Sequence, residues 1–115
     1  MQLEQKRKRI RSKMKFVTKR PRLSIHKTNR YMYAQLIEQF TGKVLASYDT
    51  KRLVKDNKAM ESKSAIEKVK AMAQELAKRI KKSGHTDIVF DRSGYKYHGK
   101  VKMLADTLRE SGINF

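Results

Sequence analysis

The spacing of apolar residues along this 115-residue chain changes from period two to helical period, and these changes predict its strands and helices. From Pro21 onward apolar and polar residues alternate. Leu23 and Ile25 therefore share one face of an expected strand, and the polar residues beside them share the other. Residues 28–30 predict a turn, and residues 31–40 predict a second, longer strand.

The second predicted strand is apolar on both faces. Its apolar residues are Tyr33 and Ile37 on one face, and Met32, Ala34, Leu36 and Phe40 on the other. Such a strand is typical of a sheet that is covered on both faces. Residues 41–43 then predict a tight turn and residues 44–48 a third strand, which gives a three-strand meander.

Helical periodicity follows a polar stretch. Residues 49–61 are polar and basic, and we expect a surface loop there. Ser62 or Ser64 can cap the helix that follows, and Ser64 with Glu67 matches a capping box, in which the serine hydroxyl accepts a hydrogen bond from an amide of the first turn. The apolar positions of the helix after it are Ala65, Ile66, Val69, Met72, Ala73, Leu76, Ala77 and Ile80. Gly84 is expected to end this helix.

A short strand and a second helix complete the pattern. Residues 88–90 are apolar, and after a loop with two glycines helical spacing returns at Val101, Leu104, Ala105 and Leu108. Gly112 should end that helix, so that Ile113 and Phe115 can fold back onto the sheet. A strand–helix–strand connection requires a parallel pairing. The sequence therefore predicts an α/β fold with a mixed sheet: a three-strand meander, then helix, strand and helix.

Charge narrows the possible partners. Lys and Arg number 29 against 11 Asp and Glu, for a net charge of +18. A body so charged repels itself, and a polyanion relieves the repulsion. Cysteine is absent, which excludes disulfides and thiolate metal sites. No apolar run has the length of a transmembrane helix, and no signal-peptide pattern follows the basic start, so we expect a cytoplasmic protein.

The first segment carries the densest charge. Residues 1–20 contain nine Lys and Arg residues against Glu4 alone, and Pro21 follows. We expect a basic N-terminal arm over residues 1–20 and a single α/β domain over residues 21–115. Membrane binding would require a wide apolar face opposite the lysines, and the arm has few apolar residues. A polyanion with closely spaced phosphates fits better, because each neutralised phosphate releases counterions.

The loop between the last strand and the last helix has the composition of an RNA-binding surface. Residues 90–100 interleave Tyr95 and Tyr97 with Lys96 and His98. Aromatic rings can stack on unpaired bases, and cations can contact phosphates. The alternative is a turn whose tyrosines cover the end of the sheet. Both interpretations can hold together, with one tyrosine packed inward and the other exposed.

Two enzymatic interpretations of the same residues are weaker. Gly94 and Gly99-Lys100 have the spacing of a phosphate-binding loop, but Val101 stands where a hydroxyl should meet magnesium, and the tyrosines between them are bulky. A metal-dependent nuclease would use Asp49, Asp87 and Asp91. Asp87 and Asp91 are predicted at opposite ends of one strand, so they should not converge. We expect no enzyme, no metal, no cofactor and no small-molecule substrate.

The chain resembles the family of bacterial-type large-subunit ribosomal protein eighteen along nearly its whole length. The stretches that carry the resemblance are residues 21–35, 42–47, 90–101, 104–106 and 109–113. The most specific is 90–101, with the sequence FDRSGYKYHGKV. The chain departs from the family at Ser93, where a second glycine is common, and in a shorter loop near residues 56–62.

The resemblance implies a ribonuclease-H-like mixed sheet without catalytic use, led by a basic extension. It also implies a structural component of the large ribosomal subunit that binds 5S rRNA. Such a protein helps attach 5S rRNA to 23S rRNA in the central protuberance, beside neighbouring large-subunit proteins. The RNA-binding residues that it implies are Lys6, Arg7, Lys8, Arg9, Arg11, Lys13, Arg20, Arg22, Lys27, Asn29, Arg30, Tyr31, Arg92, Tyr95, Lys96, Tyr97, His98 and Lys100. A generic basic RNA chaperone remains an alternative that would not discriminate among RNAs.

Overall fold

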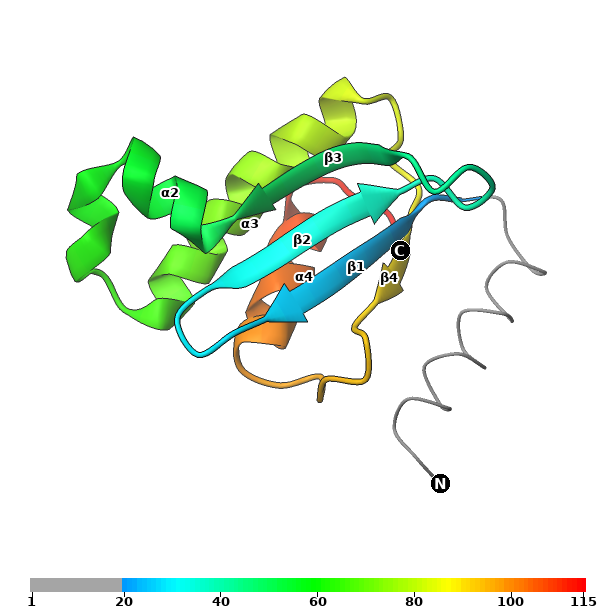
Figure 1. The fold of residues 1–115 in the computed structure, drawn as a ribbon. Coiled ribbons are helices and arrows are strands. Elements are labelled where there is room, and N and C mark those ends of the chain that lie inside the picture. Colours follow the sequence, from blue (N-terminus) through cyan, green and yellow to red (C-terminus); the bar gives the residue numbers. More distant parts are fainter. Residues whose placement is uncertain (1–19) are drawn as a thin grey trace.

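The computed structural model describes residues 20–115, and these residues form a mixed four-stranded sheet (Figure 1). The strands are β1 (Arg22–Lys27), β2 (Met32–Ile37), β3 (Val44–Asp49) and β4 (Val89–Asp91), in the spatial order β3-β2-β1-β4. The first three pair antiparallel as the predicted meander, and β4 pairs parallel to β1. The α/β class and the mixed sheet are confirmed.

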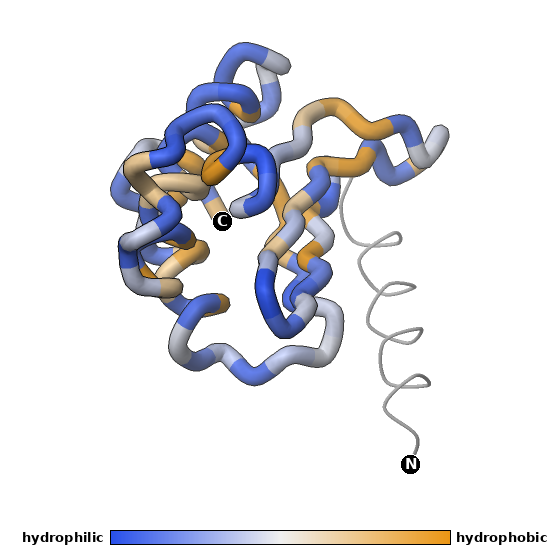
Figure 2. The backbone as a smooth tube through the Cα atoms, turned by 60° about the vertical axis from the view of Figure 1, so that its left-hand side comes forward, coloured by the Kyte–Doolittle hydropathy of each residue, from blue (hydrophilic) through white to orange (hydrophobic). Residues whose placement is uncertain are grey.

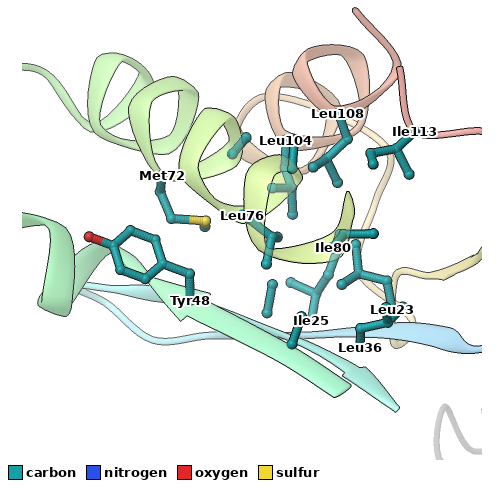
Figure 3. Close-up of a cluster of buried hydrophobic side chains, with 14 of the residues drawn as sticks. Leu23, Ile25, Leu36, Tyr48, Met72, Leu76, Ile80, Leu104, Leu108 and Ile113 are labelled. Carbon is teal, nitrogen blue, oxygen red and sulfur yellow. The ribbon is translucent and has the colours of Figure 1, made fainter. Parts of the chain in front are cut away.

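Two helices pack on one face of this sheet (Figures 1 and 2). They are α3 (Ala65–Lys82) and α4 (Lys100–Glu110), both close to their predicted positions. Figure 3 shows their buried leucines facing the side chains of the strands, and the fully buried residues include Leu23, Leu36, Leu76, Leu104 and Leu108. Burial of each such side chain contributes about 1.5–3 kcal/mol, which makes this layer the core. No helix within residues 20–115 meets the length and apolarity that a membrane crossing requires.

The ends of both helices follow the sequence signals. The Ser64 hydroxyl accepts a hydrogen bond from the Glu67 amide at 3.2 Å and caps α3. Gly84 and Gly112 follow the two helices with φ of 87° and 96°, a left-handed conformation that favours glycine. The C-terminal residues fold back as predicted: Ile113 is buried, and the rings of Phe115 and Phe90 stack with centroids 5.2 Å apart.

Within residues 20–115 the sheet is covered by helices on one face only, against the expectation of two covered faces. The two long helices lie on the same side, so within residues 20–115 the face that bears Tyr33 and Gln35 has no helix on it. The apolar character of β2 on this face comes from Tyr33 and Ile37, which are only partly buried. Phe40 is 70% exposed and not part of β2, because the strand ends at Ile37 and a turn begins at Glu38.

The predicted surface loop over residues 49–61 is also wrong. It contains helix α2 (Thr50–Asp56) and the 3-10 helix η1 (Lys58–Ser62). Asp49 begins α2, since one carboxylate oxygen accepts from the Arg52 amide at 2.7 Å and the other from the Arg52 side chain at 2.8 Å. Leu53 of α2 joins the core at 8% exposure. In the sequence, α2 is indicated only by one capping side chain and one leucine, and the polar composition of the segment outweighed both in the prediction.

Tyr48, at the end of β3, connects α2 and α3 to the sheet. The guanidinium groups of Arg79 and Arg52 lie 4.5 Å and 5.4 Å from the centre of its ring. Its hydroxyl donates to Asp56 at 3.2 Å. Burial and this carboxylate raise the pKa of the Tyr48 hydroxyl. The ring thus fixes the position of α2, which its short length alone would not maintain.

The cap of α2 gives a test of the fold. Replacement of Asp49 by alanine should lower the free energy of unfolding by about 1–2 kcal/mol, because the Arg52 amide and guanidinium lose their acceptor. Urea denaturation monitored by circular dichroism measures this change. Glu61→Ala, at an exposed position of η1, is the control and should change stability by less than about 0.5 kcal/mol. Equal stabilities of the two variants would show that the cap is not needed.

Candidate nucleic-acid interface

The two loops that the sequence indicates for RNA binding meet at one end of the sheet. Because β1 and β4 are parallel neighbours, the loops after Lys27 and Asp91 leave the sheet at the same end. Tyr95 joins them: its hydroxyl accepts from the Lys27 amide at 3.1 Å and lies 3.4 Å from the Lys27 carbonyl oxygen, to which it donates. Residues 27–31 and 92–100 therefore form one continuous surface.

The hairpin between β1 and β2 presents cations beside aromatic rings. Thr28 closes its turn, with its amide donating to the Tyr31 carbonyl at 2.8 Å and its hydroxyl accepting from the Tyr31 amide at 3.0 Å. Asn29 and Arg30 are exposed at the tip. The Arg30 guanidinium lies 5.6 Å from the centre of the Tyr31 ring. Charge and a flat apolar surface thus lie side by side, as stacking on bases and pairing with phosphates require.

The second loop presents its cations and anchors its tyrosines. Arg92, Lys96 and His98 are exposed. The Tyr97 hydroxyl accepts from Arg109 at 3.1 Å and lies 3.3 Å from a carboxylate oxygen of Asp106, both residues of α4. Tyr95 and Tyr97 are each half-buried, so the expected division into one inward and one exposed tyrosine is not seen. Both rings hold the loop in place.

The open face of the sheet adds residues that the sequence did not single out. His26, Tyr33 and Gln35 line a shallow hollow with Ser24 and Thr28. The rings of His26 and Tyr33 are 6.0 Å apart, and those of Tyr31 and Tyr33 are 6.4 Å apart, edge to face. This aromatic row continues from the hairpin onto the sheet. The alternation of apolar and polar residues along β1 and β2 already placed these side chains on one face of the sheet. The expectation that both faces are covered meant that this face was not considered as a binding surface.

The remaining predicted residues lie in or before β1, at the start of α4, or outside the described residues. Arg22 begins β1, about 17 Å along the strand from Lys27 at 3.3 Å per residue. Its guanidinium is paired with Asp91, at 3.1 Å. Arg20 is exposed and precedes this strand, and Lys100 is half-buried at the start of α4. The arm positions lie outside the described residues: Lys6, Arg7, Lys8, Arg9, Arg11 and Lys13.

The aspartates of the nuclease interpretation have structural partners and do not converge. Asp49 caps α2, Asp87 accepts from the Asn114 side chain at 2.8 Å, and Asp91 binds Arg22 and the Ser93 amide. Asp49 and Asp91 belong to the two edge strands of the sheet, about 14 Å apart at the usual strand spacing. Within residues 20–115 no group of three metal-ligating side chains is present.

Comparisons with known proteins agree on one family. The family model described as ribosomal L18 of archaea, bacteria, mitochondria and chloroplasts matches residues 1–115. Large ribosomal subunit protein uL18 of Staphylococcus saprophyticus is 42% identical over 107 residues, 93% of this chain and 87% of that protein. Those of Lactobacillus delbrueckii and Borrelia recurrentis are 41% and 42% identical, over 94% and 95% of this chain and 87% and 88% of theirs.

Ser93 gives a test of the second loop. Its φ of 54° lies in the left-handed region, and its buried hydroxyl has no hydrogen-bond partner among the described residues. Ser93→Gly removes both the backbone strain and the unpaired hydroxyl. This gain in folding free energy exceeds the entropic penalty of a glycine in the unfolded chain, so the free energy of unfolding should rise by about 1 kcal/mol. Thermal unfolding measures the change. Ser83→Gly is the control, because the Ser83 hydroxyl donates to the Ile80 carbonyl at 2.6 Å and φ is negative, so that stability should fall. Destabilisation by Ser93→Gly would contradict the strain.

Proposed function

Because this chain belongs to the family of large-subunit ribosomal protein eighteen, we propose that it binds 5S rRNA and helps attach it to 23S rRNA in the central protuberance. Membership makes the chain a structural component of the large ribosomal subunit, with ribosomal RNA as its partner, and not an enzyme. The expected localisation to the large ribosomal subunit is thereby confirmed. The choice of 5S rRNA, and of particular residues, is the proposal.

The observation that supports the proposal most directly is the junction of the two loops at Tyr95. The hydroxyl of Tyr95 holds Lys27, and so places the exposed cations Arg30, Arg92 and Lys96 on one surface. Cations that are fixed relative to one another can match the phosphate spacing of a folded RNA, whereas mobile cations match any polyanion. A shape-selective protein needs this arrangement, and a generic chaperone does not.

Each group of residues has a distinct proposed role. Lys27, Asn29, Arg30 and Tyr31 contact RNA from the first hairpin. The second loop contributes Arg92, Lys96, His98 and Lys100. Tyr95 and Tyr97 act by positioning these cations, since their hydroxyls bind Lys27 and α4. Arg22 has a carboxylate partner in Asp91, so its contribution to phosphate binding should be smaller than that of the hairpin cations.

The arm over residues 1–20 has a different proposed role from the domain over residues 21–115. Its Lys and Arg residues follow one another closely along the sequence, and Arg20 connects it to β1. We assign to it contacts with the phosphate backbone of RNA, which add affinity and carry little sequence information. The division of the chain at Pro21 remains a prediction, because residues 1–19 lie outside the described residues.

The loop surface is tested by competition of 5S rRNA with tRNA across a salt series. Affinity for 5S rRNA should persist at salt concentrations that abolish tRNA binding. The double variant Arg30→Ala, Lys96→Ala should lose this preference for 5S rRNA. The slope of its log affinity against log salt should decrease by the equivalent of about one phosphate contact for each cation removed. The control is Lys70→Ala, Lys102→Ala, with equal charge loss at exposed positions on the helices. Equal loss in both pairs, or equal binding of both RNAs at all salt concentrations, would favour the chaperone.

The arm is tested by a triple variant. Arg7→Ala, Arg9→Ala, Arg11→Ala should weaken binding of 5S rRNA and tRNA alike, because contacts with phosphates are common to both RNAs. The slope of log affinity against log salt should fall by about three phosphate contacts. Filter binding of labelled RNA at several salt concentrations measures both quantities. A selective loss of 5S binding would instead place shape recognition in the arm.

A further inference from the structure

The outer edge of β3 forms a groove with α3 on the side of the molecule away from β4. β3 is an edge strand, and within residues 20–115 it pairs only with β2 (Figure 1). The groove is lined by Val44, Leu45, Ala46 and Ser47 of β3, and by Glu75, Lys78, Arg79, Lys82 and Ser83 at α3 and its end. An edge strand presents backbone amides and carbonyls that can pair with another chain.

One side of this groove is apolar and continues into a fixed turn. Val44 is 46% exposed, and Phe40 at the turn before it is 70% exposed. The Glu38 carboxylate orders that turn by accepting from the Thr41 hydroxyl at 2.6 Å and from the amides of Thr41 and Phe40 at 2.7 and 3.0 Å. These hydrogen bonds lower the pKa of the Glu38 carboxyl group, and the one from the Thr41 hydroxyl has the largest effect. The turn that carries the exposed Phe40 is therefore ordered by side-chain hydrogen bonds as well as by backbone ones.

The other side of the groove is basic. Lys78 and Lys82 are exposed and lie one helical turn apart on α3. Arg79 stacks on the Tyr48 ring and pairs with Glu75 at 3.3 Å, so this acidic residue of the groove already has a cation. The two lysines leave a positive rim along the free edge of the strand.

We propose that the β3 edge is a docking site for an extended acidic segment of another protein, which adds to the sheet as a fifth strand. In such a strand alternate side chains point to opposite faces. Apolar side chains on the face away from α3 would contact Val44, which pairs with Ile37, while carboxylates on the face toward α3 would reach Lys78 and Lys82. The backbone of the segment would satisfy the amides and carbonyls of β3.

Charge and chemistry argue against the other occupants. The basic arm of this chain would be repelled by the lysine rim, and a second copy of the chain would bring two such rims together. RNA can accept from the strand amides, but its phosphates cannot pair with the carbonyls between them. The residues of β3 that line the groove offer no ring on which a base could stack, and the exposed ring of Phe40 lies outside the groove, at the turn before β3.

The probe for this site is an acetylated, amidated hexapeptide of alternating Glu and Val, titrated into the full chain with isotope-labelled amides. Amide shifts should be confined to Val44–Asp49 and residues 78–82. The variant Lys78→Glu, Lys82→Glu should bind the peptide about tenfold more weakly or worse. Lys70→Glu, Lys102→Glu has the same charge change away from the groove and should bind like the parent. Absence of binding, shifts elsewhere, or equal weakening in both variants would overturn the proposal.

A second measurement distinguishes protein from RNA in the assembled large subunit. A photoreactive benzoylphenylalanine in place of Val44 should cross-link to a protein segment of net negative charge, identified by mass spectrometry. Val44 is 46% exposed and is not part of the core cluster, so the replacement leaves the core intact. Cross-linking to rRNA, to a basic protein segment or to nothing would overturn the proposal. Binding of 5S rRNA is measured separately by the competition assay, so either proposal can fail alone.

Discussion

The parallel pairing of β4 with β1 is the constraint on which the rest of the structure depends. It sets Leu23 opposite Phe90 and Ser24 opposite Asp91, so that both strands run toward the same end of the sheet and β1 extends three residues beyond the end of β4. The loops that follow them are far apart in sequence, yet Tyr95 can reach the backbone of Lys27. Without this pairing the cations of the two loops would belong to separate surfaces, and no shared RNA surface could be proposed.

The same pairing decides which faces of the sheet remain open. The chain crosses from β3 through α3 to β4 and continues into α4, and both helices lie on one side (Figures 1 and 2). The buried leucines of that side form the core, while the opposite face keeps a row of aromatic side chains that includes Tyr31 and Tyr33. Because β4 occupies the edge beside β1, β3 is left as the opposite edge. The proposed RNA surface and the proposed protein-docking edge thus belong to different parts of one sheet.

Three carboxylates in this basic protein order the backbone. Asp49 caps α2, Glu38 fixes the turn after β2, and Asp91 binds the Ser93 amide and Arg22. Glu38 and Asp49 therefore do not compete for the cations of the proposed RNA surface, whereas Asp91 occupies Arg22. Exposed cations of the two loops, such as Arg92 and Lys96, remain available to an external polyanion, which the net charge of +18 favours.

The sequence by itself determined the features that depend on neighbours along the chain. Helical spacing with the Ser64 cap located α3, alternation located β1, and Gly112 marked the end of α4, because each signal lies within a few residues of its effect. The charge, and the motif over residues 90–101, were enough to indicate ribosomal RNA. Only the tertiary structure decided that within residues 20–115 one face of the sheet bears no helix, that α2 packs beside Tyr48, and that Lys27 and Tyr95 meet. These depend on which side of the sheet the helices pack and on contacts between distant residues, and local periodicity carries no information about either.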